Sequence, residues 1–73
     1  MKKASSHDFG IVLKNSQGLY YCGLNKFDNQ IRKSQIYHSV KYAEEACRHI
    51  NSAENLRGII QDFTLVKVEI KEV

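Results

Sequence analysis

The feature that most constrains this fold is an apolar stripe of helical period between Ser39 and Asn51. At about 100° per residue its members fall on one side of a helix, and charged side chains occupy the other side. Ser39 can cap the start of this helix. The stripe consists of Val40, Ala43, Ala46, Cys47 and Ile50. Because most of these side chains are small, we expect the helix to lie close against a sheet.

Two segments with strand character precede this helix. Residues 9–14 and 19–24 are rich in apolar and aromatic side chains, and the turn between them ends in Gly18, which can adopt the left-handed conformation that closes a hairpin. The sequence therefore predicts a β-hairpin in which Asn15 pairs with Leu19. Both faces of this hairpin carry apolar residues, so either face can form the core.

A further strand is predicted near the C-terminus, where apolar residues alternate with charged ones. Its apolar positions are Val66, Val68 and Ile70. The short pair Ile36 and Tyr37 is a candidate for one more strand before the helix. The order β-β-(β)-α-β predicts an α+β fold with two layers, in which an antiparallel sheet of three or four strands is covered by one main helix.

The length of 73 residues leaves room for one domain with a small core. We expect this domain to span residues 1–73, with residues 1–7 disordered. No apolar run is long enough to cross a membrane, and the first residues lack the apolar segment of a secretory signal. A cytoplasmic protein is therefore expected. The predicted core between helix and sheet comprises Val40, Ala43, Cys47, Ile50, Val66, Val68 and Ile70.

Charge is distributed unevenly along the chain. Residues 1–41 carry seven cationic side chains against two carboxylates, whereas residues 42–73 carry four against six. The formal net charge of +3 is thus divided into +5 and −2. If the two parts form different surfaces, the basic surface will favour an anionic partner.

The sequence gives no support for a catalytic or metal site. Cys22 and Cys47 are too few for a disulfide framework, and we expect two free thiols in a reducing compartment. Cys22 with His38 or His7 could in principle supply a nucleophile and a base, but a thiol in the middle of a strand is more often a packing residue. The carboxylates are scattered and no glycine-rich phosphate loop occurs. We therefore expect a protein without enzyme activity, cofactor or metal.

Three segments, GLYYCGL, SQIYHSVKYAEEAC and TLVKVEIKEV, together resemble a group of very small proteins encoded by phages and prophages of Gram-positive bacteria. In that group a hairpin with Gly-x-Tyr after its turn leads into an Ile-aromatic-x-Ser-x-x-x-Ala segment and a terminal Val-x-Val-x-Ile strand. The likeness covers residues 9–73. It implies an accessory protein, active in the host cytoplasm, that binds and blocks a host enzyme or defence complex.

The segment NKFDNQIRKSQ, residues 25–35, is the candidate functional segment. It is basic, it contains neither proline nor glycine, and it carries the aromatic residue Phe27. We expect a long loop in which Phe27 fills a pocket of the partner while the cations steer association. The alternative is that Phe27 folds back onto the core. The predicted partner-binding residues are Lys26, Phe27, Arg32, Lys33 and Lys41.

The function predicted from the sequence is therefore the binding, and with it the modulation or inhibition, of a host protein that has an acidic surface. The alternative is a small basic protein that binds nucleic acid, since its cations are interleaved with Tyr20, Tyr21 and Tyr37. A homodimer is also compatible with the sequence, because edge strands can pair between subunits.

Overall fold

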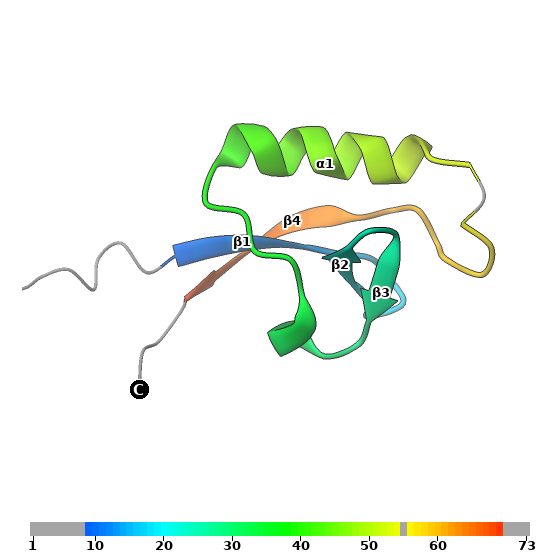
Figure 1. Ribbon diagram of the computed structural model, residues 1–73, viewed down its shortest axis with the longest axis horizontal. Helices are drawn as coiled ribbons and strands as arrows, with labels where there is room; N and C mark the ends of the chain where they lie inside the picture. The colour runs from blue at the N-terminus through cyan, green and yellow to red at the C-terminus, as the bar shows by residue number, and fades with distance from the viewer. Residues whose placement is uncertain (1–8, 55, 70–73) are drawn as a thin grey trace, which may run out of the picture.

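The protein is represented by a computed structural model that describes residues 9–54 and 56–69. Four strands form one antiparallel sheet in the order β3-β2-β1-β4, and one helix covers a face of it (Figure 1). The elements are β1 (Phe9–Lys14), β2 (Tyr20–Gly23), β3 (Lys26–Asp28), a 3₁₀ turn (Ile31–Lys33), α1 (Val40–Ser52) and β4 (Thr64–Glu69). The predicted α+β fold with two layers is confirmed. The expectations for residues 1–7 and for Ile70 lie outside the described residues.

The hairpin between β1 and β2 forms with the predicted pairing. The Asn15 N–H donates to the Leu19 carbonyl at 3.0 Å, and Lys14 lies opposite Tyr20. Gly18 has the positive φ of 80° that the turn requires. The Asn15 side-chain oxygen accepts from the Leu19 N–H at 2.9 Å, which fixes the turn from inside.

Beyond this pairing β1 and β2 diverge, and residues 35–37 fill the gap between them. The Ile11 N–H and carbonyl each bond to Tyr37 at 2.8 Å. The Gln35 N–H donates to the Tyr21 carbonyl at 2.9 Å. The strand proposed at Ile36 and Tyr37 is therefore a single bridge. The third strand is instead β3, inside the segment that was expected to be a loop.

The helix begins where the sequence predicts, but its buried stripe starts one turn later. The Ser39 side chain accepts from the Tyr42 N–H at the start of α1. Val40 is 57% exposed, so its predicted core position is wrong. It is the first residue of the helix and lines a surface cavity beside Phe9 and Lys67, outside the buried cluster. The buried core cluster is Leu13, Ala43, Cys47, Ile50 and Phe63.

The strand β4 presents the opposite face to α1 from the one predicted. Its register with β1 places Leu65 opposite Leu13 and Val66 opposite Val12. Leu65 packs against the core cluster. Because side chains alternate along a strand, Val66 and Val68 lie on the face away from α1. The prediction that these two valines join the core between helix and sheet is therefore wrong.

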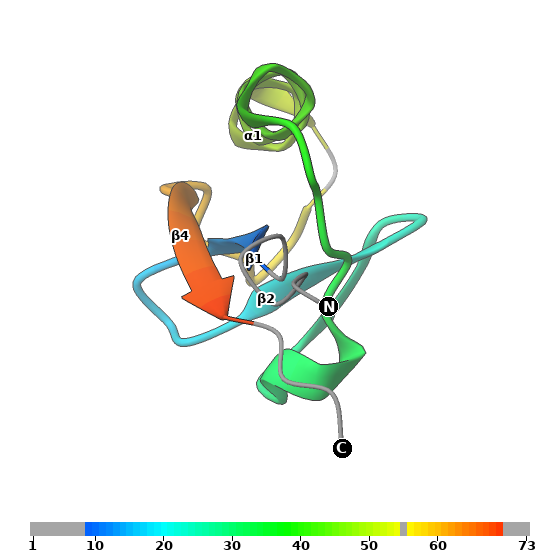
Figure 2. The same ribbon diagram turned by 90° about the vertical axis from the view of Figure 1, so that its left-hand side faces the viewer.

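The sheet thus has a second apolar face. Val12 is fully buried on it, while Val66 and Val68 are half-buried. The 3₁₀ turn Ile31–Lys33 lies on this side of the sheet, opposite α1 (Figure 2). A sheet with apolar residues on both faces explains why alternation alone did not identify the face that meets the helix.

Candidate functional site

The predicted functional segment, residues 25–35, contains the edge strand β3 and a 3₁₀ turn and is not a free loop. After β3, the Asp28 carboxylate accepts from the Gln30 N–H at 2.8 Å. A second Asp28 oxygen lies 3.7 Å from the Lys33 Nζ. The Ser34 N–H closes the 3₁₀ turn by donating to the Ile31 carbonyl at 3.0 Å. Local hydrogen bonds of Asp28 thus replace the glycine or proline that the segment lacks.

Phe27 belongs to the core layer. It lies opposite Tyr21 across the strand pair, and their ring centroids are 5.7 Å apart. On its other side the buried ring of Phe63 lies at 5.5 Å. Phe27 is half-buried in this contact. The structure therefore has the arrangement in which Phe27 folds back onto the core, and its ring does not project toward a partner.

The four predicted cationic residues do not form one surface. Arg32 and Lys33 lie on the 3₁₀ turn, on the sheet face away from α1, whereas Lys41 lies on α1 (Figure 1). Lys26 begins β3 at an edge of the sheet. All four are exposed. Their role in partner binding stays a prediction.

The turn between β2 and β3 carries a feature that the sequence reading missed. Gly23 lies opposite Lys26, so Leu24 and Asn25 are the two central residues of the turn. Both have positive φ, 53° and 60°, as in a type I′ turn. Asparagine tolerates this conformation, but it costs leucine about 1–2 kcal/mol.

Leu24 is also the most exposed large apolar residue among those described, at 88%. In the sequence it reads as the last apolar residue of a strand. The signal that could have identified a turn is Gly23, followed directly by a leucine and an asparagine. Leu24 therefore combines an unfavourable backbone conformation with an unfavourable solvent exposure.

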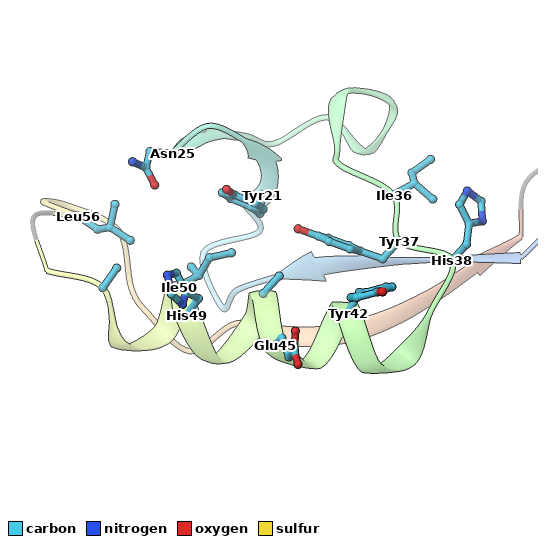
Figure 3. Close-up of a pocket in the computed structure, with 12 residues that line it drawn as sticks. Tyr21, Asn25, Ile36, Tyr37, His38, Tyr42, Glu45, His49, Ile50 and Leu56 are labelled. Atoms are coloured by element: carbon cyan, nitrogen blue, oxygen red, sulfur yellow. The ribbon is translucent and has the colours of Figure 1, made fainter.

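Beside this turn a groove of about 590 Å³ runs between α1 and the chain segments at residues 21–25 and 36–38 (Figure 3). Tyr42, 65% exposed, and Ile36 line the end of the groove near His38, away from Asn25. The hydroxyl of Tyr37 points along the groove toward Tyr21, and partial burial beside Tyr21 raises the pKa of Tyr37. Besides the tyrosine hydroxyls, polar groups of the groove come from Asn25, His38, Glu45 and His49. Its walls are mainly aromatic and aliphatic, which suits an apolar side chain.

Neither thiol has the properties of a catalytic nucleophile. Burial, followed by the charge of Asp28, raises the pKa of Cys22 against a smaller opposing effect of Lys33. Burial also raises the pKa of Cys47, whose Sγ lies 3.0 Å from the Phe63 carbonyl, although Asn51 lowers it. Reactive thiols require the opposite shift. Both cysteines are free.

In residues 9–54 and 56–69 no three His, Cys, Asp or Glu side chains gather in a way that could hold a metal ion. Within the same ranges no helix has the length and apolar character needed to cross a membrane.

Comparison of this chain with protein-family models, curated proteins and solved structures gives no match.

Proposed function

We propose that this chain is a non-catalytic interaction protein that binds another protein through Leu24 and the adjacent groove. The observation that carries the proposal is Leu24 itself, 88% exposed with a φ of 53°. Leucine at this position destabilises the free protein through its backbone conformation and leaves an apolar side chain in water. Burial of a leucine side chain contributes about 1.5–3 kcal/mol, which a complex would recover.

The groove supplies the complementary half of the surface. At the end of the groove away from the turn, Tyr42 and Ile36 expose aromatic and aliphatic area, and tyrosine is a typical anchor of protein interfaces. Leu24 would enter a pocket of the partner, and an apolar side chain of the partner would enter the groove. In the setting that the resemblance implies, the partner is a host protein whose activity is modulated or inhibited.

The basic residues play a separate part in this proposal. Arg32 and Lys33 lie on the sheet face away from α1, so a partner that fills the groove does not face them directly. Their contribution would be long-range attraction of an acidic partner, which acts on the association rate and weakens with salt.

A photo-crosslinking experiment tests the binding surface. A photoreactive aromatic residue replaces Tyr42 in the full chain, which serves as bait in a lysate of the cells that naturally make the protein. The captured protein is identified and purified, and its affinity is measured for the wild type and for Leu24→Asn. Asparagine keeps the left-handed turn and removes the apolar side chain, so the fold is retained while binding weakens by about 30-fold, a hot-spot loss of about 2 kcal/mol.

The matched control is Ile31→Asn, which removes an exposed aliphatic side chain from the other face of the sheet and should leave affinity unchanged. Equal affinity of wild type and Leu24→Asn would contradict the proposal. Capture that is lost on nuclease treatment and insensitive to Leu24→Asn would contradict it as well, and would favour the nucleic-acid alternative.

A further inference from the structure

The outer edge of β4 has backbone groups that point away from the sheet. Ile11 exchanges both of its backbone hydrogen bonds with Tyr37, so it does not bond to Lys67, its neighbour on β4. Hydrogen-bonded and non-bonded pairs alternate in an antiparallel ladder. Val66 and Val68 therefore bond to β1. Three residues direct their N–H and C=O groups outward: Leu65, Lys67 and Glu69.

This edge is closed only at its beginning. The Phe63 N–H donates to the Asn51 side-chain oxygen at 2.8 Å, and the Phe63 carbonyl accepts from the Asn51 amide at 3.0 Å. A side chain of α1 thus takes the place of a neighbouring strand. The three outward-facing residues that follow have no such hydrogen-bond partner within the described part of the chain. An edge strand without proline, glycine or bulge is a template for another strand.

The charges of this edge select a particular register for such pairing. Lys67 and Glu69 lie on the same face, two residues apart. In an antiparallel pair of two β4 strands centred on Lys67, the two lysines would lie opposite each other and repel. A pair centred on Val66 would place Lys67 opposite Leu65. A pair centred on Val68 places Lys67 of each copy opposite Glu69 of the other, which gives two attractive contacts.

We propose that a second copy of this chain occupies the edge, with β4 paired antiparallel to its counterpart and Val68 on the two-fold axis. The contact is self-complementary, as an isologous dimer requires. The half-buried Val68 would meet its counterpart on the face away from α1, and Val66 would lie diagonally beside the partner's Val68, which extends the second apolar face across both copies. The Leu24 turn joins β2 and β3 on the other side of the sheet from β4, so the dimer leaves two such turns free for binding.

The test measures the mass of the full-length protein in solution as a function of concentration, by light scattering or sedimentation. The wild type should dimerise. Lys67→Glu alone or Glu69→Lys alone should raise the dissociation constant by at least about tenfold, because each variant turns two attractive contacts into two repulsive ones. An equimolar mixture of the two variants should form a heterodimer, since the acidic edge of one then lies opposite the basic edge of the other. The double variant should dimerise like the wild type.

Cysteine crosslinking tests the register independently. Val68→Cys should form a disulfide between copies on mild oxidation, because residues opposite each other in a non-bonded pair are close enough, with Cα atoms about 4.5 Å apart. Val66→Cys, which does not face its own counterpart, serves as the control. Circular dichroism checks the fold of each variant. Lys67 also lies over the Phe9 ring at 4.8 Å, so Glu69→Lys and Val68→Cys decide the outcome if Lys67→Glu unfolds.

A wild type that stays monomeric would overturn the dimer. So would single variants that dimerise like the wild type, or a mixture that does not associate. A disulfide through Val66→Cys without one through Val68→Cys would overturn the register. None of these readouts involves Leu24 or its partner, so the dimer can be refuted without refuting the proposed function, and the reverse also holds.

Discussion

Leu24 has a φ of 53° at an exposed turn, a conformation that asparagine and glycine adopt more easily. We expect Leu24→Asn to raise the free energy of unfolding by about 1 kcal/mol, because the backbone conformation is relieved and no buried contact is lost. Leu24→Ala is the control, since alanine removes the side chain but keeps the Cβ, and it should leave stability nearly unchanged. Urea unfolding of the three proteins measures both effects. A loss of stability in Leu24→Asn would show that the side chain supports the fold.

The contrast between Leu24 and Phe27 shows where the sequence could not locate the site. Phe27 is the conspicuous aromatic residue of a basic segment, yet its position opposite Tyr21 carries it onto Phe63. Leu24 reads as the end of a strand because an Asn-Gly or Asp-Gly pair, the usual signal of a type I′ turn, is missing. Which of the two side chains is exposed depends on the strand pairing of β2 and β3, and local composition does not encode it.

Among the elements, the sequence predicted the type of each long segment but not the orientation of every face. The hairpin, the Ser39 cap and the terminal strand all follow from turn residues, capping and periodicity. The face that β4 turns toward α1 depends on its register with β1, which brings Leu65 rather than Val66 onto the helix side. A shift by one residue exchanges the two faces, and both carry apolar residues here.

Residues on the buried stripe of α1 should contribute more to stability than the residue at its start. Ile50 is 7% exposed in the core cluster, so Ile50→Ala should lower the free energy of unfolding by about 2–4 kcal/mol through lost burial and a cavity. Val40 belongs to the same sequence pattern but is 57% exposed, and Val40→Ala should change stability by less than about 0.5 kcal/mol. Chemical denaturation compares the two variants. Equal losses of unfolding free energy in Ile50→Ala and Val40→Ala would mean that the first turn of α1 is packed as tightly as the last.

In the molecule as a whole, the groove and the basic 3₁₀ turn lie on opposite sides of the sheet, and the β2–β3 turn with Leu24 lies beside the groove. Arg32 and Lys33 are therefore placed to attract a partner at a distance, while Tyr42 and Ile36 are placed to contact it. The uneven charge along the sequence indicated an electrically polar molecule, but it did not show which side carries the contact surface.

The pH dependence of stability reports on the whole fold through the weak acids whose pKa values folding shifts. Burial raises the pKa of Cys22 and Cys47 above the ordinary value of 9.0, so the folded state favours the neutral thiols. Their contribution to stability is fully present below the pKa of the unfolded chain and is lost as the pH rises through the folded pKa. At the acid end, hydrogen bonds from Ser16 lower the pKa of Asp62, and that contribution is lost as the pH falls through the lowered value.

We therefore expect the free energy of unfolding to decrease above about pH 9 and to decrease less steeply in a Cys22→Ser, Cys47→Ala double variant. The double variant should also stay folded near pH 7 and keep its partner affinity, because neither thiol touches the proposed binding surface. Tyr37→Phe is the control, since it removes a different raised pKa, that of a hydroxyl with an ordinary value of 10.0, and keeps both thiols. Denaturation curves across the pH range measure the slopes. If the free energy of unfolding decreases as steeply above pH 9 in the double variant as in the wild type, the thiols do not couple protonation to folding. A double variant that stays folded but does not bind the partner would refute a purely structural role of the thiols.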